Sequence, residues 1–158
     1  MGEDTVYEFG ASGVLNKGFQ GHIEYHFILP EKVERLHIEM GFDKRDFTGS
    51  TEELLALCAK AFKGHLPGKE LPMPAEQITR LAGSLIKTEV NYSVFFEDEF
   101  LGTAWWDDMV KETVMDGKSA GRGFLPWQPQ AGPLRIVLHA LSVVNDETAY
   151  YLKLRGER

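Results

Sequence analysis

Apolar and polar side chains alternate along a stretch near the start of the chain. Between Phe19 and Leu29 every second position is apolar, with His22, Glu24 and His26 between them. A period of two is the pattern of a strand that buries one face. The sequence therefore predicts a half-buried strand whose polar face carries two histidines and a glutamate.

A second alternating run covers residues 35–40, directly after the turn-forming residues 30–32. The simplest interpretation is an antiparallel hairpin that joins the two runs. Its register pairs Tyr25 with Ile38 and so places the apolar partners on one face.

Residues 51–86 change from a strand period to a helical one. Ser50 and Glu53 have the spacing of a capping box, which marks a helix start. The first apolar stripe then consists of Leu54, Leu57, Cys58 and Ala61. After a Pro/Gly-rich link, Pro74 begins a second helix, whose stripe is Ile78, Leu81, Ala82 and Leu85. We expect each helix to pack its apolar face on something larger.

The strand pattern returns in the second half of the chain. Strands are predicted at 90–96, 100–106 and 109–115, and a long loop at 117–132. The apolar runs 134–144 and 149–154 suggest a hairpin across 145–147, with its first strand in the centre of a sheet. Strands at both ends with helices between them predict one domain, 1–158, that is mainly β: an antiparallel β-sandwich, jelly-roll-like, with a two-helix insertion around residues 51–86.

Composition narrows the function classes. The chain has 158 residues, one cysteine, and 17 Lys and Arg against 24 Asp and Glu, a net charge of −7. A lone cysteine excludes a disulfide framework and a cysteine-rich zinc module. The negative balance argues against nucleic-acid binding. The sequence shows neither a long apolar run nor a signal peptide, so we expect a soluble, cytoplasmic protein that does not bind membranes.

One motif has the letters of a hydrolase nucleophile elbow, Gly117-Lys118-Ser119-Ala120-Gly121. An elbow needs a buried strand before the serine and a helix after it. The residues that follow, Arg122 to Pro126, cannot open a helix, so a loop is the favoured interpretation.

The first hairpin offers a candidate metal site. Its predicted register puts His26 opposite His37 and Glu24 opposite Glu39. Two imidazoles and two carboxylates on adjacent strands could bind Zn²⁺ or a similar ion. The favoured alternative is an ordinary solvated strand face, because metal sites usually have supporting hydrogen bonds and a concave setting.

Aromatic and acidic residues form a candidate ligand site. Trp105, Trp106, Asp107 and Asp108 are consecutive, and Trp127 lies in the long loop. Exposed tryptophans beside carboxylates are suited to holding a sugar ring. The alternative is packing: adjacent strand residues point to opposite faces, so at least one of the first two tryptophans is expected in the core.

The order of these segments resembles a known domain. The stretches Val90-Asn91-Tyr92-Ser93-Val94, Gly123-Phe124-Leu125-Pro126 and Gly132-Pro133-Leu134-Arg135-Ile136, together with the first and last predicted hairpins, are similar to the β-sandwich domain found N-terminal to PHP-type metallohydrolases of the CehA/McbA kind. In such proteins the metal ligands and the phosphoesterase chemistry belong to the following PHP domain. The resemblance thus implies no catalytic residue here, and the chain ends without room for that domain.

The leading hypothesis is a non-catalytic accessory or interaction module, without a cofactor, whose partner is another protein or a second copy. By resemblance it is associated with metal-dependent phosphoesterase systems. A ligand or carbohydrate binder that uses the tryptophan cluster is the second hypothesis. A metal-dependent hydrolase built on His26, His37 and the outward glutamates is the third.

Overall fold

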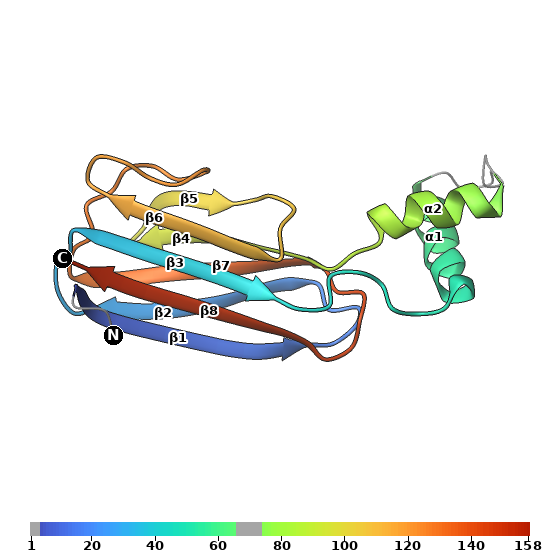
Figure 1. Cartoon of the computed structure of the whole chain (residues 1–158), viewed down its shortest axis with the longest axis horizontal. Helices are drawn as coiled ribbons and strands as arrows, with labels where there is room; N and C mark the ends of the chain where they lie inside the picture. Colours follow the sequence, from blue (N-terminus) through green and yellow to red (C-terminus); the bar gives the residue numbers. More distant parts are fainter. Residues whose placement is uncertain (1–3, 66–73) are drawn as a thin grey trace.

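The computed structural model describes residues 4–65 and 74–158 of the chain (Figure 1). Within them lie eight strands and two helices. The elements are β1 (Thr5–Leu15), β2 (Gly21–Leu29), β3 (Arg35–Phe42), α1 (Thr51–His65), α2 (Ala75–Leu85), β4 (Glu89–Phe96), β5 (Glu99–Ala104), β6 (Val110–Asp116), β7 (Gly132–Ser142) and β8 (Thr148–Glu157).

The strands form two antiparallel sheets that pack face to face. One sheet has the order β1-β8-β3-β6, here called sheet A, and the other has the order β2-β7-β4-β5, called sheet B. The chain passes from one sheet to the other at most of its connections. The two strand orders that result are those of a jelly roll. The predicted antiparallel β-sandwich is confirmed, and β7 lies inside its sheet as expected.

The space between the sheets is filled by alternate side chains of both. Fully buried examples are Leu36, Ile38 and Met40 of β3, Tyr92 and Val94 of β4, Ile136 and Leu138 of β7, and Leu152 and Leu154 of β8. Burying these side chains removes a large apolar area from water, which is the main favourable contribution to folding.

Both predicted long hairpins are wrong. β2 pairs with β7 and not with β3, which pairs with β6 and β8. β7 and β8 likewise lie in different sheets. The connection from β2 to β3 crosses the end of the sandwich, where Val33 is buried and its N–H donates to the Pro129 carbonyl. Two strands with alternating apolar residues show the same pattern whether they are paired in one sheet or face each other across the core. Alternation alone therefore does not determine which strands are paired.

One strand, β1, falls where the sequence pattern predicted none. It pairs with β8 over nearly its whole length, from Thr5 to Leu15. Its middle, residues 10–13, consists of Gly, Ala, Ser and Gly, which give almost no hydrophobic alternation.

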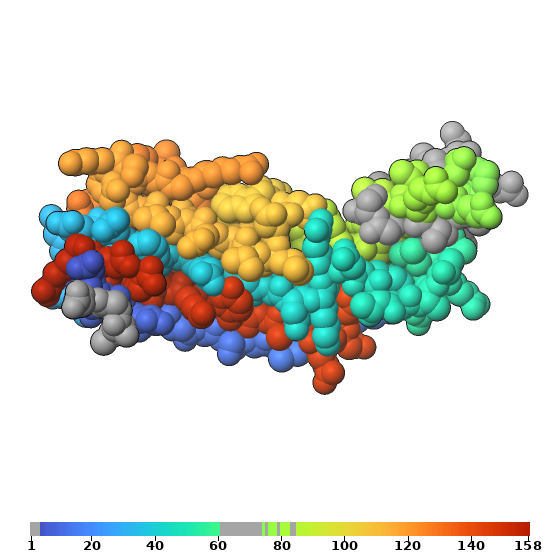
Figure 2. Space-filling model, in the orientation of Figure 1, coloured from blue at the N-terminus to red at the C-terminus, as the bar shows by residue number. Residues whose placement is uncertain are grey.

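The helices form a pair beyond one end of the sandwich (Figures 1 and 2). The capping box at the start of α1 is confirmed: the Glu53 N–H donates to Ser50 Oγ at 3.2 Å, and the Ser50 N–H donates to Glu53 Oε2 at 3.0 Å. The buried residues of the pair are Leu54, Cys58, Ile78 and Ala82, which pack against one another. The two helices thus bury their apolar faces on each other, whereas Leu81 and Leu85 are exposed. The predicted link between the helices and the side chain of Ala61 lie outside the described residues.

Asn145 anchors the base of the helical insertion. Its side-chain oxygen accepts from the N–H and the hydroxyl of Thr48, at 3.0 and 2.9 Å. Its side-chain nitrogen donates to the carbonyls of Lys44 and Asp46, at 2.9 and 2.7 Å. One buried amide therefore fixes the segment that leads from β3 into α1.

Candidate interaction surface

The predicted histidine and glutamate site does not form. His26 of β2 lies opposite Arg135, and His37 of β3 lies opposite Arg155 and Val114. Because β2 and β3 belong to different sheets, their polar faces point to opposite outer surfaces of the sandwich. The prediction that His26 faces His37, and Glu24 faces Glu39, is therefore wrong. Within residues 4–65 and 74–158, no three or more His, Cys, Asp or Glu side chains are grouped to hold a metal ion.

Each half of the predicted site has local partners instead. Glu24 accepts from Arg135 at 3.4 Å and contacts His26 Nε2 at 3.3 Å, on the outer face of sheet B. On the outer face of sheet A, Glu39 Oε1 accepts from the Tyr151 hydroxyl at 2.6 Å. That bond to a carboxylate, with partial burial, raises the pKa of Tyr151 to about 12.

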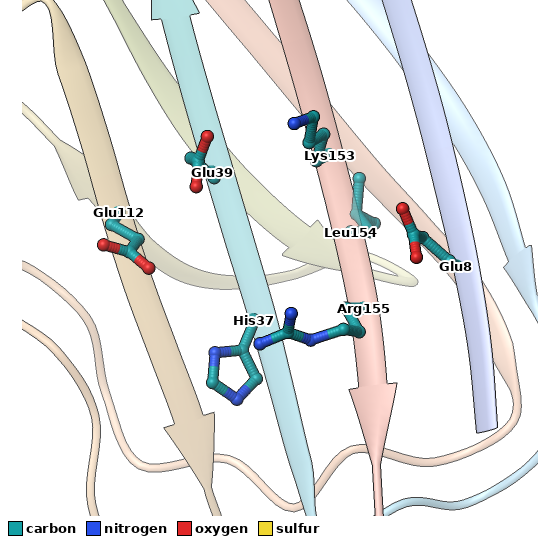
Figure 3. A pocket seen from close by; sticks show the side chains of 7 residues that line it. All are labelled: Glu8, His37, Glu39, Glu112, Lys153, Leu154 and Arg155. Carbon is teal, nitrogen blue, oxygen red and sulfur yellow. The ribbon is translucent and has the colours of Figure 1, made fainter. Parts of the chain in front are cut away.

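The outer face of sheet A has a shallow depression of about 200 Å³ (Figure 3). It is lined by charged residues from all four strands, among them Glu8, Glu112 and Lys153. At its lower end in Figure 3 lie His37 and Arg155, which both contact Glu157, at 2.9 and 2.8 Å. Burial alone would raise the pKa of Glu157, but its contacts with His37 and Arg155 hold it below its usual value. In the strand register Glu8 lies opposite Arg155, and Glu39 lies opposite both Lys153 and the like-charged Glu112.

The tryptophan cluster is divided between surface and core. Trp105 is 53% exposed, Trp106 is partly buried against the core, and Trp127 is buried with its ring 4.8 Å from Phe96. The predicted strand 100–106 ends at Ala104, so strand alternation does not apply to these two tryptophans, and Trp106 packs only partly against the core. The three rings do not share one exposed platform, because Trp127 fills the core end of the long loop.

The neighbouring Asp107 has a structural partner set. Its carboxylate accepts from Arg45 at 2.8 Å and from Lys87 at 2.5 Å. These two residues lie on the segments that lead into and out of the helical insertion. The hydrogen bond from Lys87, with the nearby Arg45 charge, lowers the pKa of Asp107. Asp107 thus connects the segments before α1 and after α2 to the sandwich. The backbone carbonyl of the adjacent Asp108 accepts a hydrogen bond from Lys111 Nζ.

The elbow-like motif forms a tight loop, as expected. Asp116 Oδ1 accepts from the N–H groups of Lys118 and Ser119 at 2.7 and 2.6 Å, and Oδ2 accepts from the Ser119 hydroxyl at 2.9 Å. The Ser119 hydroxyl therefore donates its hydrogen bond within the turn. These donors lower the pKa of Asp116.

Sequence reasoning missed a polar line on the outer face of sheet B. His139 Nε2 lies 2.7 Å from Ser93 Oγ, and His139 Nδ1 lies 2.9 Å from His22 Nδ1. Burial, and secondly the adjacent His22, lower the pKa of His139, which favours the neutral ring. A serine beside a neutral imidazole is a nucleophile geometry. However, Ser93 is 7% exposed on a strand paired on both sides, whose backbone N–H groups are used by the sheet and cannot bind an oxyanion.

The long loop between β6 and β7, residues 117–131, seals one side of the sandwich and is here called the sealing loop. It runs along the edges of β5 and β6, at the top of Figure 1. Ala120 of the loop forms an antiparallel β-bridge with Met115 of β6, and Phe124 forms one with Gly102 of β5. The Leu125 N–H also donates to the Leu101 carbonyl at 2.9 Å. Both sheet edges on this side therefore have backbone partners.

The opposite side of the sandwich, along the bottom of Figure 1, is formed by the edge strands β1 and β2. Among the described residues, β1 pairs only with β8 and β2 only with β7. Between these edges lies a strip of partly buried apolar residues, here called the open seam: Phe9, Ala11, Ile23, Tyr25 and Phe27. The rings of Phe9 and Phe27 lie 5.6 Å apart across it. Unpaired edges beside partly exposed core residues are the features of a docking surface.

Comparison with known proteins assigns the chain to a family. The model of a family of unknown function, DUF6669, matches residues 4–158. The chain belongs to this family. No curated protein matches it significantly. A crystal structure of a protein from Sulfurospirillum deleyianum is similar, with a TM-score of 0.37 and 10% identity, over 91% of this chain and 96% of that one.

The DUF6669 match spans the whole sandwich, including the open seam and the sealing loop.

No helix in the described parts of the chain is long and apolar enough to cross a membrane. The open seam was missed by sequence reasoning because it depends on strand order. The β2 half of the seam follows the alternation that the sequence shows, whereas on β1 the alternation of Tyr7, Phe9 and Ala11 is interrupted by the glycines around it.

Proposed function

We propose that this protein is a non-catalytic interaction module that binds another polypeptide along the open seam and the edges of β1 and β2. The observation that carries the proposal is the contrast between the two sides of the sandwich. One side is closed by a dedicated loop with backbone bonds to β5 and β6, and the other has no such cover among the described residues.

The chemistry of the open side suits a polypeptide. A strand edge presents N–H and C=O groups in a regular row, which an incoming strand satisfies by β-augmentation. Val14 of β1 and Ile28 of β2 are 61% and 68% exposed beside this row and offer apolar contact. A partner strand would gain backbone hydrogen bonds and bury the seam in one step.

A non-catalytic role fits the polar clusters. The sheet A depression is shallow, and its His37 and Arg155 both contact Glu157. The Ser93 and His139 pair lies on a strand whose backbone N–H groups are used by the sheet. By the resemblance, this module is associated with metal-dependent phosphoesterase systems.

Site-specific photo-crosslinking in the producing cell tests the proposal. A photoreactive residue replaces Val14 on the open side or, as the matched control, Val110 on β6, which is 50% exposed on the same outer face. We expect defined adducts from position 14 and none from position 110. Adducts only at position 110, or at neither position, would contradict the proposed surface.

A further inference from the structure

The edge of β1 has few of the features that prevent strands from pairing. It is 11 residues long, contains no proline, and carries a single charge, at Glu8. One β-bulge lies between Thr5 and Tyr7, and the remaining register, from Tyr7 to Leu15, is regular. Natural proteins usually protect an exposed edge with charges, prolines, bulges or short strands. An unprotected edge of this length is expected to have a strand partner.

The residues at the centre of this edge are small. Gly10, Ala11, Ser12 and Gly13 leave the backbone accessible to a neighbouring strand. The side chains on the inner face, such as Phe9, are partly buried, and Val14 on the outer face is exposed. An incoming strand therefore meets little steric resistance at its centre and apolar surface on both faces.

We propose that this partner is β1 of a second copy of the chain, paired antiparallel about a two-fold axis at Ala11. The pairing would join two four-stranded sheets A into one sheet of eight strands. This inference rests on the proposed function, since it names the occupant of the open side. Ala11 is the midpoint of the regular stretch from Tyr7 to Leu15, so pairing about it uses the whole stretch in both copies.

The charge pattern favours a second copy in this register. A chain of net charge −7 repels itself, so a self-contact needs a nearly neutral surface. In the proposed register Glu8 lies opposite Val14 of the partner, and Gly10 lies opposite Ser12. The two Glu8 residues are then about 20 Å apart along the strands, beyond the Debye length of about 8 Å. Each residue also faces one on the same side of the sheet, as antiparallel pairing requires.

The same register identifies a sharp variant. Val14→Glu would place a carboxylate directly opposite Glu8 of the partner, and like charges in that position are destabilising. Val14 is 61% exposed, so the monomer should tolerate the change. Val110→Glu is the matched control, with the same residue type on the outer face of the same sheet at its opposite edge.

Sedimentation velocity over a range of concentrations measures the assembly. We expect the natural chain and Val110→Glu to form dimers, and Val14→Glu to dimerise at least tenfold more weakly. The double variant Glu8→Lys with Val14→Glu should restore the dimer, because opposite charges then face each other. A natural chain that stays monomeric, or a dimer that Val14→Glu leaves intact, would overturn the proposal.

Hydrogen exchange locates the contact independently. The amides of residues 7–15 that point away from β8 should exchange more slowly in the dimer than in the Val14→Glu monomer. The crosslinks from position 14 separate this inference from the proposed function. An adduct with twice the mass of the chain supports self-pairing, whereas an adduct with a different protein overturns self-pairing and leaves the interaction module standing.

Discussion

Gly102 of β5 lies so close to Gly123 of the sealing loop that neither has room for a side chain. A Cβ at Gly102 would overlap the Gly123 carbonyl oxygen, and a Cβ at Gly123 would overlap the Thr103 carbonyl oxygen. Both glycines also have positive φ, 147° and 82°, which other residues adopt at a cost. The contact allows the Thr103 N–H to donate to Gly123 at 2.9 Å, so these two glycines let the loop seal the edge of β5.

Replacing Gly102 with alanine should therefore open the sealed side. We expect Gly102→Ala to lower the free energy of unfolding by about 2 kcal/mol or more, through backbone overlap and strain. Urea denaturation measures the loss. The control is Gly10→Ala on β1, where a Cβ would meet only the Leu152 carbonyl at an ordinary 3.8 Å, and we expect a change within about 0.5 kcal/mol. Equal losses in the two variants would contradict this account.

Lys111 is a buried cation whose pKa makes stability depend on alkaline pH. Its Nζ donates to the carbonyls of Val90 and Asp108, at 2.8 and 2.5 Å, and lies 5.3 Å from the centre of the Phe42 ring. Burial lowers its pKa from 10.5 to about 8. Between these values the unfolded chain binds more protons than the folded one, so stability rises with pH.

We expect the free energy of unfolding to rise by about 1.5 kcal/mol between pH 8 and pH 9.5 from this residue alone. The measurement stays below pH 10 because burial raises the pKa of Tyr7 to about 12 in the folded protein. Above pH 10 this tyrosine ionises more readily in the unfolded chain, which lowers the free energy of unfolding. Lys111→Met removes the titrating group and should abolish the rise. A rise of the same size in Lys111→Met would assign it to other groups.

Local signals in the sequence predicted local structure correctly. The capping box at Ser50 and Glu53 forms as the spacing requires, because both of its hydrogen bonds lie within one turn of helix. The alternation in β2 also holds, with Ile23, Tyr25 and Phe27 on the inner face and His26 exposed. Each of these features depends on residues only a few positions apart.

The pattern of apolar and polar residues did not predict which distant segments pair with each other. The Ser93 and His139 contact joins residues 46 positions apart, and the Tyr25 and Tyr150 hydroxyls meet at 2.7 Å across 125 positions. Those contacts depend on which strands are neighbours, and alternating runs with equivalent apolar faces do not specify neighbours. The predicted metal site failed for this reason, since it assumed a register between β2 and β3.

Asn145 should control how firmly the helical insertion is attached. Asn145→Ala removes the partner of Thr48 and leaves the carbonyls of Lys44 and Asp46 without their amide donor, so we expect a loss of about 2–3 kcal/mol. Asn16→Ala, at an exposed position, is the control and should change stability little. Hydrogen exchange would locate the effect: amides of residues 44–48 should exchange faster in Asn145→Ala, while those of β8 stay protected. Uniform acceleration across both sheets would show that Asn145 supports the whole sandwich instead.

The pair of His22 and His139 predicts an acid-sensitive surface on sheet B. Burial, and secondly the neighbouring His22, lower the pKa of His139 below its ordinary value of 6.5. The stability that the neutral ring contributes is therefore complete above pH 6.5 and is lost as the pH falls through the pKa of His139 in the folded protein.

Titration of the imidazole C–H signals by NMR measures this directly. We expect the midpoint for His139 to lie below 6.5, and His22→Gln to move it upward without reaching 6.5, because burial remains the larger cause. His26→Gln, on the same strand face as His22 but four residues away, is the control and should leave the His139 midpoint unchanged. A midpoint at or above 6.5 in the natural chain, or one that His22→Gln does not move, would contradict the contact between the two rings.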